Sequence, residues 1–242
     1  MENCSTKYEI HAPAKLTLSL AIKGVRQSGL HELEAEMVTI DLQDTLRLRE
    51  GDIEVTYQGA YPITPSPNDD LIVQALNTVG LSMKVNVDKN IPPGGGLGGG
   101  SANAAAILRW ANFEDEKKAV HLGSDVPFNI RGGRANVSGV GESITYLPYE
   151  EKTFTLILPP FGCSTAAVYK RWDEMGGPKS PNGNDLEPAA LDVYPELQKW
   201  KEILEEHSQK EARLAGSGST WFVEGNYPAE GLIVATTTKE NF

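Results

Sequence analysis

A glycine-rich segment is the part of this 242-residue chain whose composition points most directly to chemistry. Six of the seven residues from 94 to 100 are glycine, and Ser101 and an alanine-rich apolar run follow them. Glycine lets the backbone approach an anion without an obstructing Cβ, and a helix N-terminus offers free N–H groups at the positive end of its dipole. With Ser101 as the N-cap of a helix over 101–112, the segment predicts a phosphate site built mainly from main chain.

Two known nucleotide-binding motifs, the dinucleotide fingerprint and the P-loop, fit this segment poorly. The remaining alternative to a phosphate site is a structural turn. Gly94, Gly96 and Gly99 satisfy the G-x-G-x-x-G dinucleotide fingerprint, with Glu114 to Glu116 roughly 20 residues further on. However, Pro92-Pro93 separate these glycines from the preceding strand. A P-loop would need a lysine directly after the glycines, and none is present. A flexible turn is disfavoured, because each glycine costs on the order of 0.5–1 kcal/mol in chain entropy.

Composition and charge limit the class of protein. The formal net charge is −11, which argues against a general binder of nucleic acid or anionic membranes, since phosphate backbones need a basic surface. No apolar run reaches the roughly 18 residues of a membrane span, and the N-terminus lacks an export signal. Cys4 and Cys163 are expected to be thiols rather than a disulfide. These features predict a soluble cytoplasmic protein.

The elements that must position the glycine segment mix strands and helices without strict alternation, which predicts an α+β fold. Breaks are expected at Ala12–Ala14, at Gln43-Asp44, at 50–52, in the proline-rich loop 61–70, and at Ser124–Pro127, where Pro127 disfavours helix at the preceding residue. The expected elements, read from hydrophobic periodicity, are strands within 7–24 and 34–59, a helix over 70–81, a strand over 83–91, the helix over 101–112, strands over 134–141 and 154–160, helices over 164–174 and 186–206, and strands within 212–225 and 231–238.

Several motifs resemble those of the GHMP kinases, which are named for galactokinase, homoserine kinase, mevalonate kinase and phosphomevalonate kinase. The motifs occur in the family's order and are APAKLTLSL at 12–20, GLHELEAEMVTIDLQDTL at 29–46, PGGGLGGGS at 93–101, LGSDVPF at 122–128, NDLEPAA at 184–190 and GSGS at 216–219. The resemblance implies a two-domain fold, with a first half similar to ribosomal protein S5 domain 2 and a ferredoxin-like second half. We place the domains at residues 1–145 and 146–242, with the active site between them. The short spacing between Glu224 and Leu232 predicts a trimmed second half without its usual helix.

The resemblance also assigns roles to particular residues. It implies that Lys15 and Asp125 form the catalytic pair and that Ser101 is a possible ligand of Mg²⁺, which would otherwise be held by phosphates and water. The residues implied in ATP binding are Pro93, Gly94, Gly95, Gly96, Leu97, Gly98, Gly99, Gly100, Ser101 and Asp70. The residues implied in acceptor binding are Thr17, Leu30, His31 and Tyr169. No dedicated metal site is expected, because His11, His121 and His207 show no metal-ligand spacing.

The member of the family with the most similar motifs phosphorylates a cytidyl diphosphate polyol in isoprenoid biosynthesis. The resemblance therefore implies transfer of the γ-phosphate of ATP to the 2-hydroxyl of that polyol, with Asp125 accepting the hydroxyl proton. Thr17, Leu30 and Asp70 stand where the family usually has asparagine, tyrosine and asparagine. These departures leave two alternatives open, another small-molecule GHMP kinase or a non-catalytic ligand-binding protein on the same fold. Retention of Lys15 and Asp125 favours an enzyme, expected to be a monomer or weak homodimer.

Overall fold

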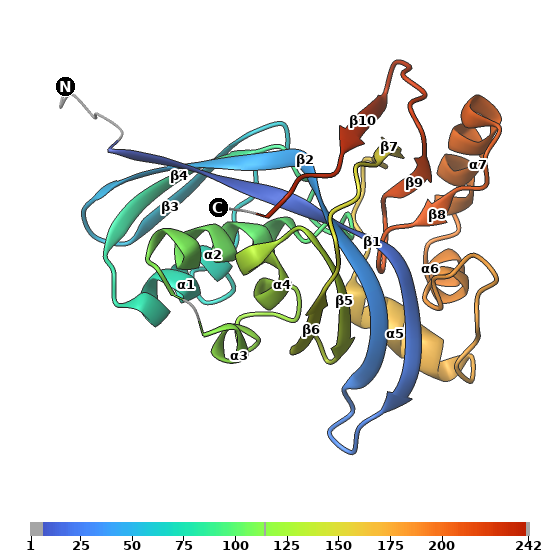
Figure 1. Cartoon of the computed structure of the whole chain (residues 1–242), viewed down its shortest axis with the longest axis horizontal. Helices are drawn as coiled ribbons and strands as arrows, with labels where there is room; N and C mark the ends of the chain where they lie inside the picture. The colour runs from blue at the N-terminus through green and yellow to red at the C-terminus, as the bar shows by residue number, and fades with distance from the viewer. Residues whose placement is uncertain (1–6, 114, 241–242) are drawn as a thin grey trace.

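The computed structural model describes residues 7–113 and 115–240, which form two β-sheets with helices packed against them (Figure 1). The first sheet is six-stranded, with the order β3-β4-β2-β5-β6 and with β1 paired to β2. Its strands are β1 (Tyr8–Val25), β2 (His31–Glu50), β3 (Glu54–Gly59), β4 (Met83–Lys89), β5 (Arg134–Gly139) and β6 (Ser143–Tyr146). The helices of this half are α1 (Leu71–Val79), α2 (Gly99–Trp110), α3 (Glu116–Ala119) and α4 (Val126–Arg131).

The second sheet is four-stranded, with the order β10-β7-β9-β8. Its strands are β7 (Thr153–Ile157), β8 (Arg213–Leu214), β9 (Trp221–Glu224) and β10 (Leu232–Thr236). The helices of this half are α5 (Thr165–Glu174), α6 (Glu187–Val193) and α7 (Leu197–Ser208). The α+β prediction is confirmed, and β9 connects to β10 without a helix, as the short spacing predicted. None of the described helices has both the length and the apolar character needed to span a bilayer.

The strands β1 and β2 form one long antiparallel hairpin, so two of the predicted breaks are wrong. Strand β1 continues through Pro13, and its pairing register with β2 shifts between Pro13 and Lys15. A proline is tolerated there because β1 is paired on one side only and the register shift is a bulge. Strand β2 continues through Gln43 and Asp44, and Asp44 is fully buried. Packing on both sides of the hairpin overrides the local turn signal.

Two helix predictions are also corrected. Helix α4 begins at Val126, although Pro127 was expected to prevent helix there. Proline fits the first turn of a helix, because an N–H at that position would have no intrahelical partner. The predicted helix over 186–206 is two helices, α6 and α7, because Pro195 lies between them and cannot continue the hydrogen-bond ladder.

The two halves share apolar clusters. Leu16 and Leu18 of β1 pack with Phe154, Leu156 and Phe222 of the second sheet. The chain also returns to the first sheet near its C-terminus, where the N–H at position 238 donates to the carbonyl at position 39 (2.9 Å). The domain boundary between residues 145 and 146 stays a prediction.

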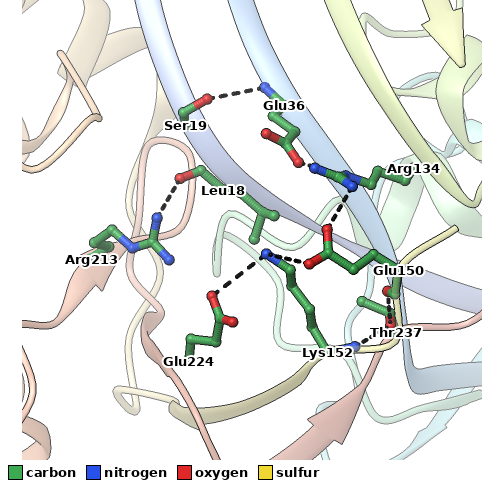
Figure 2. A network of polar contacts seen from close by, with 9 residues as sticks. All are labelled: Leu18, Ser19, Glu36, Arg134, Glu150, Lys152, Arg213, Glu224 and Thr237. Carbon is green, nitrogen blue, oxygen red and sulfur yellow. Dashed lines mark hydrogen bonds and ion pairs between the residues drawn. The ribbon is translucent and has the colours of Figure 1, made fainter. Parts of the chain in front are cut away.

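A network of polar contacts adds to this connection between the sheets (Figure 2). Arg134 donates to Glu36 (2.8 Å) and to Glu150 (2.7 Å). Lys152 Nζ lies 3.4 Å from Glu150 and 3.8 Å from Glu224 of β9. These side chains are partly exposed, so each pair contributes at most about 1 kcal/mol. The relative placement of the sheets therefore depends mainly on the apolar core.

Candidate active site

The glycine-rich segment connects β4 to α2 and is held by both halves of the molecule. Its Leu97 carbonyl accepts a hydrogen bond from the Lys15 N–H of β1 (3.1 Å). Its Gly94 carbonyl accepts from the N–H groups of Cys163 (2.9 Å) and Ser219 (3.0 Å) in the second half. The segment is therefore a fixed loop at the junction of the two halves, and not a flexible turn.

Helix α2 begins earlier than the sequence predicted. Its N-cap is Gly98, whose φ of 67° lies in the left-handed region, and Ser101 is already within the first turn. The prediction that Ser101 is the N-cap is therefore wrong. Glycine adopts this φ at little cost, so Gly98 can turn the chain directly into the helix. The first N–H groups of the helix have no intrahelical partner and are available to an anion.

The glycines of the segment serve different purposes. A Cβ added at Gly96, whose φ is 75°, would lie 1.9 Å from the Ala215 carbonyl oxygen. A Cβ at Gly94 would lie 2.9 Å from the Cα of Gly162. These two glycines permit close packing against the second half. By contrast, the nearest atom to a Cβ at Gly100 is 3.6 Å away, on Leu71, so space remains above the helix N-terminus.

Gly96→Ala is expected to destabilise the protein by about 2–5 kcal/mol, because it combines backbone strain with a severe contact. Urea unfolding measures the change. Gly100→Ala is the matched control, since its Cβ meets only ordinary contacts and alanine favours the helix. Equal stability of the two variants would contradict a packing role for Gly96.

The predicted catalytic pair is assembled from two distant parts of the chain. Lys15 Nζ of β1 lies 3.3 Å from Oδ2 of Asp125, which is the N-cap residue of α4. Lys15 also donates to Thr17 Oγ1 (3.0 Å), and Asn129 Nδ2 donates to the Asp125 carbonyl (2.8 Å). The Lys15 side chain is buried and that of Asp125 is partly exposed. A carboxylate in this position can accept a proton from a hydroxyl, and the ammonium can stabilise developing negative charge.

A cavity of about 640 Å³ surrounds this pair. Every site residue predicted from the sequence lines it except Leu97, which is buried in the core. Residues of α1 line one part of the cavity and residues of α5 line another. In Figure 1, α1 lies at the left and α5 lies well away from it, behind the β1–β2 hairpin, and the catalytic pair lines the same cavity as both helices.

The part of the cavity beside α5 is aromatic. The ring centroid of His31 lies 4.7 Å from that of Tyr169 and 5.6 Å from that of Trp172. His31 Nε2 is hydrogen bonded to Asp173 Oδ1 (2.8 Å). Burial, with a smaller effect of the Asp125 charge, raises the pKa of Tyr169 to about 12. The Tyr169 hydroxyl therefore stays protonated and uncharged near neutral pH. Leu30 lies exposed at the rim.

The sequence did not point to Asp173 or Trp172. Their spacing from Tyr169 could have indicated them, because residues three and four positions apart lie on the same face of a helix.

The part of the cavity beside α1 contains buried polar groups. Asp70 caps α1 by accepting from the Ile72 N–H (2.9 Å), and its other oxygen accepts from the Tyr57 hydroxyl (2.8 Å). Burial and the Asp70 charge raise the pKa of Tyr57. Lys89 lines the same cavity and donates to Asp44 (2.5 Å). The sequence pointed to none of Tyr57, Lys89 and Asp44; only the position of Lys89 just before the glycine segment could have indicated it.

The described residues include no group of three or more His, Cys, Asp or Glu side chains placed to hold a metal ion. Cys163 is a buried free thiol, and burial is the main cause that raises its pKa to about 11. Cys4, and Glu114 of the dinucleotide alternative, lie outside the described residues.

Comparison with known proteins first defines the class. Residues 70–139 match the family model of the GHMP kinases N terminal domain, and this range includes the glycine segment and Asp125. The Methanococcus jannaschii mevalonate kinase, at 15% identity, shares the fold with a TM-score of 0.59 over 98% of this chain and 100% of its own. The chain therefore has the fold and the glycine-rich loop of a GHMP kinase.

Relatives of known name narrow the class further. A 4-diphosphocytidyl-2-C-methyl-D-erythritol kinase of Pasteurella multocida is 32% identical over 97% of this chain and 87% of its own length. One of Desulfitobacterium hafniense is 36% identical over 88% of this chain and 86% of its own. A crystal structure of 4-(cytidine 5'-diphospho)-2C-methyl-D-erythritol kinase, 26% identical, covers 95% of this chain and 99% of its own with a TM-score of 0.72. The chain belongs to the family of 4-diphosphocytidyl-2-C-methyl-D-erythritol kinases.

Proposed function

We propose that this chain is an ATP-dependent kinase that phosphorylates the 2-hydroxyl of 4-diphosphocytidyl-2-C-methyl-D-erythritol in isoprenoid biosynthesis. The supporting observation is the Lys15–Asp125 pair, 3.3 Å apart, in a cavity that the glycine segment and the His31–Tyr169 rings also line. Family membership supports the choice of acceptor. A turnover assay with this acceptor, free methylerythritol phosphate, homoserine and mevalonate tests the proposal. Equal turnover of the other acceptors would contradict the cytidyl specificity.

In the proposed reaction, the acceptor oxygen forms a bond to the γ-phosphorus while the bond from that phosphorus to the bridging oxygen breaks and ADP leaves. Asp125 accepts the hydroxyl proton. Lys15, 3.3 Å away, orients this carboxylate and stabilises charge near the attacking oxygen. The N–H groups at the start of α2 bind the phosphates. Phosphoryl transfer requires mostly such positioning and charge stabilisation.

We propose that Mg²⁺ binds mainly through the phosphates and water. Ser101 lines the cavity and offers one oxygen ligand of the kind that Mg²⁺ prefers, so the residues present fit an ion that phosphates and water mainly hold. When bound, the ion would neutralise phosphate charge. From the composition of the chain, we further propose a cytoplasmic location. We also propose a monomer or weak homodimer.

The departures from the family pattern do not favour the non-catalytic alternative. Thr17 accepts a hydrogen bond from Lys15 (3.0 Å), so the position usually taken by asparagine still has a polar oxygen beside the catalytic lysine. Leu30 is 54% exposed, whereas the side chain of the catalytic Lys15 is buried. Both changes are therefore compatible with turnover.

Tyr169→Ala is expected to lower kcat/KM for the cytidyl acceptor by about one to two orders of magnitude, because aromatic stacking contributes roughly 1–3 kcal/mol per base. ATP affinity should change little. Steady-state kinetics with each substrate varied in turn measures both.

Tyr169→Phe is the control, since it keeps the ring. With a pKa of about 12, the Tyr169 hydroxyl is not expected to titrate near neutral pH, so the phenylalanine variant should keep the wild-type pH profile. A loss as large as that of the alanine variant would show that the hydroxyl, and not the ring face, is responsible.

A further inference from the structure

A buried ion pair next to the glycine segment has no part in the mechanism above. Lys89 is 2% exposed and Asp44 is fully buried, and their Nζ and Oδ2 atoms are 2.5 Å apart. A Cβ added at Gly99 would lie 2.7 Å from Lys89 Nζ. The ammonium group therefore lies against the first residue of α2, beneath the loop.

This position is electrostatically unfavourable in the protein alone. The N-terminus of a helix is the positive end of its dipole, where an anion is stabilised and a cation is not. Burial adds a desolvation cost that an ion pair often fails to recover, and it lowers the pKa of Lys89 against the opposing effect of Asp44. The pair is thus poorly explained by stability, and the arrangement suits an anion bound above it.

Lys89 lies at the cavity wall, although it is only 2% exposed. Its ammonium has three N–H donors, one of which Asp44 accepts. The other lysine of the lining, Lys15, already contacts Asp125 and Thr17.

The lining as a whole needs positive charge if it binds a triphosphate. Among the described residues, its lysines are Lys15 and Lys89, and its carboxylates are Asp69, Asp70 and Asp125. The two lysines face three carboxylates of the lining, and Asp44 beneath Lys89 adds a fourth, so this region would repel phosphates without the helix N-terminus. The loss of either lysine should therefore lower the affinity for a triphosphate strongly.

Asp44 holds the lysine in place and anchors the loop. Its Oδ1 accepts from the N–H groups of Asn90 (2.7 Å) and Ile91 (2.8 Å), where the chain leaves β4 for the glycine segment. Its Oδ2 accepts from Lys89 (2.5 Å). One carboxylate of β2 therefore positions both the charge and the start of the loop.

We propose that Lys89 supplies, from the strand before the glycine segment, positive charge that offsets the triphosphate of ATP, and that Asp44 is the positioning residue that holds this charge. The inference rests on the proposed use of ATP. A P-loop lysine, which follows its glycines, provides the same kind of charge from the other side of the loop.

The test is to measure, by calorimetry, the affinities of the wild type and of three variants for ATP and for adenosine. The variants are Lys89→Met, Asp44→Asn and the double variant that combines them. Lys89→Met leaves an unpaired carboxylate near the phosphates, so its ATP affinity should fall about 10- to 100-fold. Its adenosine affinity should change by less than about threefold, because adenosine has no phosphates. The double variant should recover part of the loss, since the carboxylate is gone. Asp44→Asn keeps an oxygen for the two N–H groups and should bind ATP better than the double variant.

A matched control and a folding measurement complete the test. Lys84→Met removes another lysine of β4, one that pairs with Glu54 at the surface, and should leave ATP affinity unchanged. If Lys89→Met does not fold, as judged by its thermal transition, Asp44→Asn and the double variant still differ only at Lys89.

Equal losses for ATP and adenosine, or no difference between the double variant and Asp44→Asn, would overturn the inference. Wild-type protein that binds no ATP would overturn the proposed function as well. Wild-type binding with an unchanged affinity in Lys89→Met would overturn the inference alone.

Discussion

Asp125→Asn is expected to lower kcat about 10²- to 10⁴-fold, the usual loss when a positioned base is removed. The substitution keeps the size of the side chain and its place 3.3 Å from Lys15 Nζ, but an amide cannot accept the hydroxyl proton. ATP affinity should remain near that of the wild type, because Asp125 acts on the acceptor. Steady-state kinetics with saturating ATP and a separate ATP titration measure the two quantities.

Asp69→Asn provides the control for this prediction. Asp69 lines the same cavity and accepts a hydrogen bond from Ser66 Oγ (2.6 Å), so the variant makes the same chemical change away from Lys15. Its kcat should change by no more than about threefold, the scale of a surface substitution. A near-wild-type kcat in Asp125→Asn would remove the proton-accepting role and leave positioning as the source of catalysis.

Gly98→Val is expected to lower kcat/KM at least about 100-fold through displacement of the catalytic lysine. A Cβ at this position would lie 2.9 Å from Lys15 Cγ, 3.1 Å from Lys15 Cε and 3.5 Å from Asp125 Oδ2. The side chain would also force a β-branched residue into the left-handed region, at a cost of about 1–2 kcal/mol or more. Turnover and urea unfolding together separate the two effects.

Gly80→Val is the control that introduces the same backbone strain without the contact with Lys15. Gly80 has a φ of 68°, against 67° for Gly98, and a Cβ at Gly80 would meet no atom within 4 Å. Both variants should lose comparable stability, and only Gly98→Val should lose turnover. If Gly80→Val lost as much activity, general destabilisation would explain the result and the contact with Lys15 would not.

Much of the fold was predictable because its signals are local. Alternating apolar residues in β4 and the apolar face of α1 depend only on neighbours in the sequence. The predictions failed where distant contacts decide the outcome. Pro13 and Asp44 read as breaks, but both lie inside long strands that pair with each other and pack against distant parts of the chain.

The sequence by itself determined that this chain has the ordered motifs of a GHMP kinase, including Lys15, Asp125 and the glycine segment, because a catalytic motif keeps its residue types and spacing within a short window. Only the tertiary structure decided what most of these residues touch. It assigned Gly96 to packing against Ala215 and brought Lys15 to Asp125. It also joined Lys89 to Asp44, which depends on the register of β2 against β4 and on burial at a point where the helix, the loop and both strands meet. No local pattern specifies such a pairing, because its energy comes from groups that only folding brings together.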